Sequence, residues 1–327
     1  MKTRLALSAA LLLAAPALDA AILKVPGDHL TIAGAAAACA NGDTILVSKG
    51  TYEPFVLVGK ADVTILGKGK VVIEAAGHLH GVEVVNSPGA VLRRLRVVHA
   101  DSTGIVALNS AGVRIERCRV SEGLASGIGV GNCDDAVIRD NRVRDVQWSG
   151  VTVSSGDGVF VRGNDVRGGF QGFSVLGSKC VVLENTIRDV QADAIAVSGS
   201  SVSVLDNRAR GGFVGVWVES SSSSVTVAGN RVTKPKGEGI RIESVGVNVL
   251  DNRIKKSVLA GIRMSADDGL VAGNVVRGGS TVGLLVESAG GTYLENSARK
   301  SGQYDLDSAI GLHHNDWFEN DFPTVAP

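Results

Sequence analysis

The sequence predicts an all-β solenoid, a parallel β-helix of about eleven rungs of ~22 residues. The chain of 327 residues contains asparagines that recur every 21 to 23 residues. Short runs of alternating apolar and polar residues flank each of them in the same positions. With 42 glycines and only 4% aromatic residues, the chain favours many turns and a core of small β-branched side chains. The recurring asparagines are Asn141, Asn164, Asn185, Asn207, Asn230, Asn252, Asn274 and Asn296.

The first residues, 1–20, have the pattern of a secretory signal peptide. Lys2 and Arg4 precede the apolar run 5–15, and small residues follow it. No later stretch is apolar enough to span a bilayer. We therefore expect a secreted or periplasmic protein whose mature chain, residues 21–327, is one β-helix domain.

The segment 29–47 predicts a short Ala-rich amphipathic helix that ends at Asn41-Gly42 and is followed by a strand. An open coil exposes unpaired strand edges at its ends, which favour aggregation. We expect the helix to cap the first rung, so that the N-terminal cap and first rung occupy residues 21–61.

The repeats occupy residues 62–300. Apolar residues lie three positions before each asparagine, and usually five before and two after it. A Gly-apolar-x-apolar strand follows, as in Gly239-Ile240-Arg241-Ile242. Three short strands per unit, with no helix between them, predict a coil of stacked parallel strands. The asparagine is expected to be structural, because it tolerates left-handed backbone at a bend and can hydrogen-bond from rung to rung.

The C-terminal segment, residues 301–327, breaks the repeat, and Trp317 and Phe318 are expected to cover the last rung. The four cysteines, Cys39, Cys118, Cys133 and Cys180, form no CxxC pair and occupy different phases of the repeat. Core thiols are favoured over disulfides, although an exported protein permits either.

The stretches GDTILVSKGTYEP (42–54) and VTILGKG (63–69), together with the Asn-centred repeats, resemble the exported right-handed parallel β-helix proteins of the pectate-lyase-like superfamily. The resemblance covers about residues 22–320 and implies a right-handed coil. It does not imply one activity, because the fold hosts lyases, hydrolases, epimerases, esterases and non-catalytic surface proteins.

No catalytic residue set of these proteins transfers to the chain. Pro54 stands where pectin esterases carry a glutamate. The Gly-His-Gly of polygalacturonases and the Asp-Pro-His-Asp of alginate epimerases are both missing. Whether the protein is an enzyme therefore stays open.

One candidate site lies on the outward face of the Gly-apolar-x-apolar strands. Glu219 and Glu243 are candidate catalytic carboxylates one rung apart. An exposed tryptophan beside charged groups suits a sugar ring, so three more residues are assigned to substrate binding. The alternative is simple Glu–Arg pairing across rungs. The substrate-binding candidates here are Trp217, Arg241 and Arg263.

A second candidate site lies in the loops that precede those strands. The candidate catalytic residues His78, His80, His99 and Asp101 come from successive rungs, and Trp148 is a further substrate-binding candidate. Histidine is a natural base near neutral pH. The alternative is that these are ordinary exposed loop residues.

Arginine columns follow the asparagines and predict either a solvated face or a basic track for an anionic, uronate-containing polysaccharide. The net charge is zero, with 33 basic and 33 acidic residues, which gives no overall bias toward nucleic acid or membranes. No cofactor or metal site is evident, and Ca²⁺ binding has no ligand motif to support it.

The predicted function is recognition of a cell-surface or extracellular polysaccharide, with cleavage by β-elimination or hydrolysis left open. The alternative is a non-enzymatic surface or structural β-helix protein. We expect a monomer that binds no nucleic acid and spans no membrane.

Overall fold

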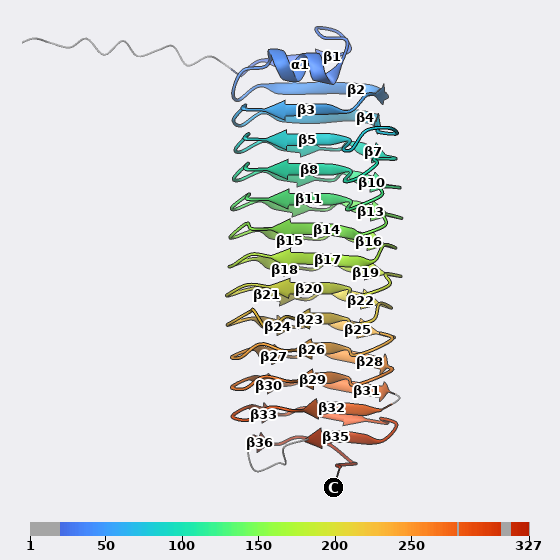
Figure 1. Ribbon diagram of the computed structural model, residues 1–327, viewed down its shortest axis with the longest axis vertical. Coiled ribbons are helices and arrows are strands. Elements are labelled where there is room, and N and C mark those ends of the chain that lie inside the picture. The colour runs from blue at the N-terminus through green and yellow to red at the C-terminus, as the bar shows by residue number, and fades with distance from the viewer. Residues whose placement is uncertain (1–19, 280, 309–314, 327) are drawn as a thin grey trace, which may run out of the picture.

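The computed structural model describes residues 20–279, 281–308 and 315–326. It is a single column of stacked coils (Figure 1), which confirms the predicted parallel β-helix. The column has about 13 turns rather than the eleven expected, because the first and last turns lie beyond the regular asparagine repeat. The single helix among the described residues, α1 (Ile32–Ala38), lies near the N-terminus.

Each regular turn contributes one strand to sheet B and two strands to sheet A. All strand pairings described are parallel, and equivalent residues of neighbouring turns lie side by side, as Val216 does with Ile240. The twelve strands of sheet B are β3 (Phe55–Val58), β5 (Val82–Val85), β8 (Ile105–Leu108), β11 (Ile128–Gly131), β14 (Ser149–Ser154), β17 (Gln171–Leu176), β20 (Ile195–Ser198), β23 (Val216–Val218), β26 (Ile240–Ile242), β29 (Ile262–Met264), β32 (Val282–Val286) and β35 (Tyr304–Ser308).

Sheet A begins with three longer or terminal strands, β1 (Ile22–Val25), β2 (Thr44–Tyr52) and β4 (Thr64–Glu74). Later turns bend once within sheet A. The strands before the bend are β6 (Val91–Arg93), β9 (Arg114–Glu116), β12 (Val137–Arg139), β15 (Phe160–Arg162), β18 (Val181–Leu183), β21 (Ser203–Leu205), β24 (Thr226–Ala228), β27 (Asn248–Leu250), β30 (Leu270–Ala272), β33 (Thr292–Leu294) and β36 (Asp316–Phe318). The strands after the bend are β7 (Arg96–Val98), β10 (Arg119–Ser121), β13 (Arg142–Arg144), β16 (Asp165–Arg167), β19 (Thr186–Arg188), β22 (Arg208–Arg210), β25 (Arg231–Thr233), β28 (Arg253–Ser257), β31 (Val275–Gly279) and β34 (Ser297–Arg299).

The core is the interior of the coil. The side chains that point inward from the strands are mostly valine and isoleucine and are almost completely buried, as Val227, Val232 and Ile240 are. Each such side chain stabilises the fold by roughly 1.5–3 kcal/mol. Side chains alternate along a strand, so burial of one set fixes which residues face solvent.

The asparagines form a ladder at the bend in sheet A. The Oδ1 of Asn207 accepts hydrogen bonds from the backbone N and from Nδ2 of Asn185, at 2.9 and 3.0 Å. The Nδ2 of Asn207 also donates to the Val182 carbonyl at 2.8 Å. The same pattern continues past Asn296 to Asn320, a rung that the sequence repeat did not predict.

The prediction that these asparagines adopt a left-handed backbone conformation is wrong. The residue before each asparagine has the positive φ, for example Asp206 at 54° and Gly229 at 68°. The asparagine itself is not among the residues with positive φ, and its buried amide supplies hydrogen bonds instead. The preceding residue therefore makes the turn, and the asparagine holds neighbouring turns together.

The N-terminal end of the column carries the expected short helix. Thr31 caps α1 by accepting a hydrogen bond from the Gly34 N–H, and α1 buries Ile32, Ala35 and Ala36. At the other end, Trp317 stacks on Tyr293 with ring centroids 4.3 Å apart and packs against the core. Phe318 is 52% exposed, so its predicted capping role is wrong, because it occupies the outward phase of β36.

The four cysteines are buried free thiols. Burial raises the pKa of Cys118, which occupies the asparagine position of an early turn, to about 12. The predicted signal peptide lies outside the described residues, apart from its last residue. Within the described residues, no helix has the length and apolar character needed to cross a membrane.

Candidate functional site

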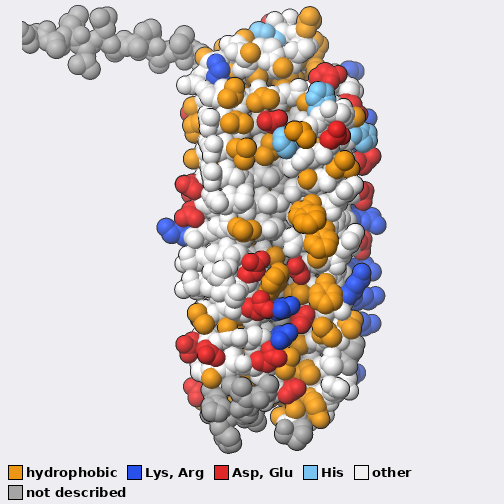
Figure 2. All heavy atoms as spheres, viewed as in Figure 1, with side chains coloured by type: hydrophobic (Ala, Val, Ile, Leu, Met, Phe, Trp, Pro, Cys, Tyr) orange, Lys and Arg blue, Asp and Glu red, His pale blue; other side chains and the backbone are white. Residues whose placement is uncertain are grey.

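The outer face of sheet B changes character along the column. Figure 2 shows acidic and basic side chains gathered over the lower half of this face, with hydrophobic side chains along its right-hand edge. Trp217, Arg241 and Arg263 occupy equivalent outward positions on β23, β26 and β29. We call the charged group around them the sheet-B cluster. Its members are Asp193, Trp217, Glu219, Glu238, Arg241, Glu243, Arg263 and Glu287.

Trp217 is held in place by its neighbours on the next turn. Its Nε1 donates a hydrogen bond to Oε2 of Glu243 at 2.9 Å. The Arg241 guanidinium lies over the indole ring, 5.5 Å from its centroid, and its Nε donates to Oε1 of Glu243 at 2.8 Å. The indole is therefore half-buried and fixed in orientation, which lowers the entropy lost when a ligand stacks on it.

Arg263 is engaged in the same way one turn further on. Its Nε donates to Oε2 of Glu287 at 2.8 Å, and Ser265 donates to the same oxygen at 2.7 Å. Glu238 is only 4% exposed, and its Oε1 lies 3.7 Å from Nη1 of Arg263. Its other oxygen, Oε2, is buried with no hydrogen-bond partner among the described residues.

Two carboxyl groups of the cluster have raised pKa values. Burial raises the pKa of Glu219, and the nearby carboxylates of Asp193 and Glu243 raise it further. Burial also raises the pKa of Asp193, against the hydrogen bond from Gln171 and the charge of Arg241. A carboxylic acid that keeps its proton closer to neutral pH can act as a general acid.

Sequence reasoning missed Asp193 and Glu238. Both lie two residues before the first apolar residue of their sheet-B strand, a position at which the neighbouring turns carry residues as different as Gln171 and Val214. No repeated residue type marked this position in the sequence.

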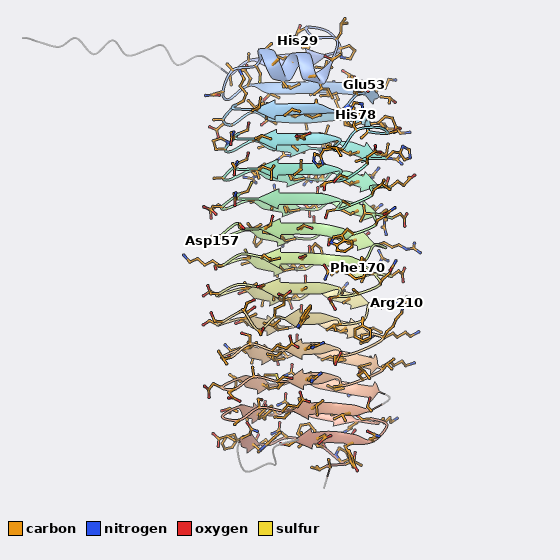
Figure 3. All side chains as sticks on the ribbon, viewed as in Figure 1. His29, Glu53, His78, Asp157, Phe170 and Arg210 are labelled. Carbon is orange, nitrogen blue, oxygen red and sulfur yellow. The ribbon has the colours of Figure 1, made fainter. Side chains whose placement is uncertain are left out.

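Three exposed aromatic residues, Trp148, Phe170 and Phe213, border the sheet-B face, and we call them the aromatic ridge; Ala192 occupies the equivalent position on the turn between Phe170 and Phe213. Trp148 and Phe170 stack with centroids 5.1 Å apart and planes inclined by 21°. All three are exposed, by 57%, 38% and 45%, and Figure 3 labels Phe170 at this edge. Each lies two residues before the glycine of its Gly-apolar-x-apolar segment, so the repeat could have identified Phe170 and Phe213 beside Trp148.

The predicted histidine site does not join the sheet-B cluster. His78 and His99 lie near the N-terminal end, where Figure 3 labels His78 beside Glu53. Their loops are five to six turns from Trp217, roughly 24–29 Å along the column. The histidine group and Trp217 therefore cannot contact one sugar.

Within the histidine group, the side chains are already engaged. Nδ1 of His99 lies 2.7 Å from Glu74 and Nε2 lies 2.9 Å from Glu122, and these hydrogen bonds raise the pKa of His99. Asp101 accepts a long bond of 3.4 Å from the Gly77 N–H. His80 lies 3.3 Å from the Thr103 carbonyl.

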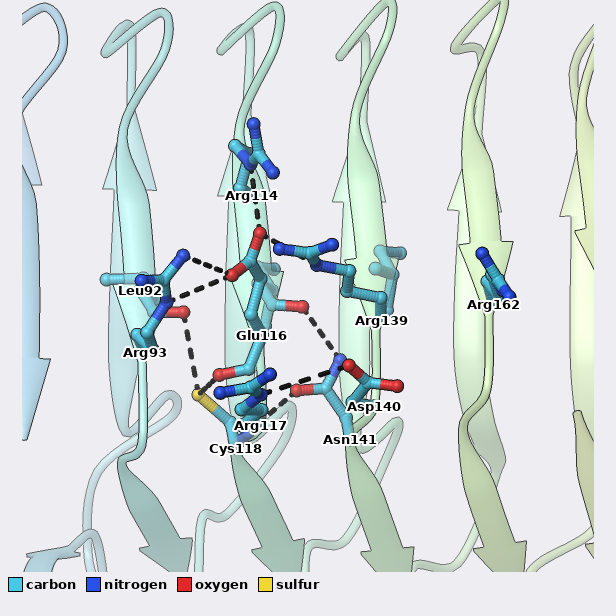
Figure 4. Close-up of polar contacts among 12 residues, drawn as sticks. Leu92, Arg93, Arg114, Glu116, Arg117, Cys118, Arg139, Asp140, Asn141 and Arg162 are labelled. Carbon is cyan, nitrogen blue, oxygen red and sulfur yellow. Dashed lines mark hydrogen bonds and ion pairs between the residues drawn. The ribbon is translucent and has the colours of Figure 1, made fainter.

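A third charged group lies on sheet A and is structural. Figure 4 shows the Glu116 carboxylate, 1% exposed, between three arginines. Nε of Arg93, Arg114 and Arg139 lies 3.0, 2.9 and 3.0 Å from its oxygens. The arginines outweigh the effect of burial and lower the pKa of Glu116 to about 2.

No group of three or more His, Cys, Asp or Glu side chains in the described part of the chain is arranged to hold a metal ion. The sheet-B cluster instead offers an aromatic surface for stacking, hydrogen-bond donors and acceptors, and carboxyl groups whose surroundings differ from one another. This combination suits binding of hydroxyl-rich rings and acid–base chemistry.

Two family models match the chain. One, described as "Right handed beta helix region", matches residues 80–232. The other, described as "Periplasmic copper-binding protein (NosD)", matches residues 170–324. No curated protein sequence matches the chain.

Solved structures share the coil at low sequence identity. The A-module of the mannuronan C-5 epimerase AlgE6 of Azotobacter vinelandii is 16% identical, with a TM-score of 0.71 over 90% of this chain and 93% of that module. The DFA-IIIase of Arthrobacter chlorophenolicus A6 is 16% identical, with a TM-score of 0.67 over 84% and 88%. The catalytic unit of the GH87 α-1,3-glucanase of Streptomyces thermodiastaticus is 17% identical, with a TM-score of 0.63 over 89% and 65%. These likenesses show the fold alone.

Proposed function

Since the chain is a right-handed parallel β-helix repeat protein, we propose that its sheet-B face binds a polysaccharide. The observation that carries this proposal is Trp217, fixed by Glu243 and Arg241 beside carboxyl groups on a flat face. The aromatic ridge extends the stacking surface along the column. Two proteins of the same fold, whose names say that they act on mannuronan and on α-1,3-glucan, also support a polysaccharide ligand.

The charge of the cluster favours a neutral glycan over a polyuronate at this face. Five carboxyl groups surround two arginines, and Glu243 and Glu287 already engage both of them. A chain of carboxylates would meet net negative charge here, whereas sugar hydroxyls can donate to carboxylates.

Hydrolysis is the second candidate function, and the raised pKa of Glu219 favours it. In this mechanism Glu219 would protonate the leaving oxygen, and Glu243 or Asp193 would be the second carboxyl group. β-Elimination has less support, because it requires a uronate substrate and free cations beside its carboxylate. The histidine group stays a separate candidate for a base.

A panel of neutral and acidic glycans tests the proposal. We expect the protein to bind a neutral polysaccharide, and Trp217→Ala to weaken that binding by about tenfold or more, because stacking and the positioned N–H are lost. Phe318→Ala, which removes an exposed aromatic ring at the C-terminal end, is the matched control. Absence of binding to every glycan of the panel, neutral or acidic, would instead favour the non-enzymatic structural role.

Release of reducing ends from the bound glycan separates hydrolysis from binding alone. Hydrolysis predicts release that Glu219→Gln abolishes while binding persists. Unchanged release in Glu219→Gln would remove Glu219 from the mechanism.

We also propose export to the periplasm or the cell exterior. The signal-like segment 1–20 supports it, as does the periplasmic description of the family model that matches residues 170–324. The mature protein is then one domain, with caps at 21–61 and 301–327 around the repeats at 62–300, and acts as a monomer. Cell fractionation and size-exclusion chromatography with light scattering test these points.

A further inference from the structure

A second surface of the molecule carries an unneutralised row of cations. It lies on β22, β25, β28 and β31 of sheet A and on the residues that follow them. Figure 2 shows basic side chains along the right-hand margin of the lower half, and Figure 3 shows Arg210 pointing outward there. We call this row the basic strip; its members are Arg208, Arg210, Arg231, Lys234, Arg253, Lys255, Lys256 and Arg277, all of them exposed.

The strip is in register along the column. Arg208, Arg231 and Arg253 are direct neighbours on consecutive turns. Lys255 and Arg277 form a second such pair. Consecutive turns are about 4.8 Å apart, close to the length of one sugar ring. Like charges at this spacing repel one another.

The strip differs from the turns that precede it. There, Asp165 holds Arg142, Arg144 and Arg188, and Arg167 pairs with Asp189. Among the described residues, no strip side chain makes an ion pair or a hydrogen bond. The cations of the strip are therefore available to an external anion.

Shallow hollows follow the strip. One of about 370 Å³ is lined by Arg208, Arg231 and Arg253, together with Asp206 and Asp251. Hollows of about 300 and 260 Å³ continue along the same arginines to Arg277. A larger one of about 630 Å³ extends past Lys255 to Arg299 and Lys300. Shared lining residues make these hollows one continuous track.

We propose that the basic strip binds an acidic polysaccharide, a linear sugar chain with one carboxylate per sugar, laid along the column axis. Guanidinium groups bind carboxylates through paired hydrogen bonds. One cation or more on each turn matches one anion on each sugar. This site is separate from the sheet-B face and does not depend on the function proposed there.

Nucleic acid fits the strip less well. Single-stranded nucleic acid is bound through aromatic side chains on which its bases stack. The residues that line the four hollows include no aromatic side chain. A flat sheet also offers no helix or β-ribbon to enter the groove of a duplex.

The test measures the affinity of the full mature chain for polygalacturonate oligomers at two salt concentrations. We expect binding that weakens as salt rises. The triple variant Arg231→Gln, Arg253→Gln, Arg277→Gln is expected to bind about tenfold more weakly or worse, with an unchanged circular dichroism spectrum.

The matched control removes the same charge from the same sheet. The triple variant Arg142→Gln, Arg162→Gln, Arg167→Gln loses three exposed arginines that are already ion-paired. It should keep at least half of the wild-type affinity. An equal loss in both triple variants would show nonspecific attraction and overturn the proposal.

Two further outcomes also overturn the proposal. One is absence of polygalacturonate binding by the wild-type chain. The other is equally tight binding of single-stranded or duplex DNA at the same salt concentration, which would reassign the strip to nucleic acid. Persistence of polygalacturonate binding in Trp217→Ala would support two separate surfaces.

Discussion

Trp217 and Glu243 lie on neighbouring turns of sheet B and are joined by a 2.9 Å hydrogen bond from the indole Nε1 to the carboxylate. The bond fixes an aromatic ring on a surface whose equivalent positions carry mainly small or charged residues. Arg241 adds a contact over the ring. The platform is therefore formed before any ligand arrives, and little side-chain entropy remains to be lost.

Trp217→Phe separates stacking from this hydrogen bond. Phenylalanine keeps an aromatic face but has no N–H, so Glu243 loses one donor. We expect glycan affinity between those of the wild type and Trp217→Ala, measured by titration calorimetry. If Trp217→Phe bound as weakly as Trp217→Ala, orientation by Glu243 would dominate; if it bound as tightly as the wild type, the hydrogen bond would be dispensable.

The raised pKa values of Asp193 and Glu219 predict a pH-dependent stability. A carboxyl group with a raised folded-state pKa contributes stability when protonated, and this is lost as pH rises through that pKa. Asp193→Asn and Glu219→Gln remain neutral, so each should raise Tm relative to the wild type at pH 7 to 8. The gain should vanish near pH 4. Thermal melts across this range test it, with the exposed Glu53→Gln as a control expected to show no such trend.

Glu116→Gln should destabilise the fold by roughly 3 kcal/mol at neutral pH, because it leaves three arginines facing a neutral group. The pKa of Glu116 is lowered to about 2. The stability that ionised Glu116 contributes is therefore fully present above the pKa of a glutamate in the unfolded chain. It is lost as the pH falls toward about 2. Urea unfolding at pH 7 and pH 3 measures both effects. Glu184→Gln, which breaks only the exposed pair with Arg162, should change stability by less than about 1 kcal/mol.

Asn207→Ala should break the ladder in its middle. The Asn185 N–H and the Val182 carbonyl would lose their buried partner, at a cost of about 2–4 kcal/mol. Asn248→Ala, on the outward phase of β27, should cost within about 0.5 kcal/mol. Equal melting temperatures for the two variants would contradict the structural role of the ladder.

The repeat could be predicted from the sequence because it is a pattern of residues close together in the chain. Burial of alternate residues such as Val225 and Val227, five and three positions before Asn230, appears directly in the sequence, and stacked parallel strands follow from it. The outward position of Trp217 and Arg241 came from the same alternation. The ends of the coil were harder to predict from the sequence, since Asn320 lies 24 residues after Asn296 and outside the regular spacing.

The sequence alone determined the coil, its phases and the residues that each face presents, because period and burial are properties of short segments. Only the tertiary structure decided which outward charges neutralise one another. Asp165 gathers arginines from two other turns, whereas Arg231 and Arg253 find no partner among the described residues. Side chains from different turns meet through rung stacking and rotamer choice, and these fix the distances on which ion pairs and pKa shifts depend.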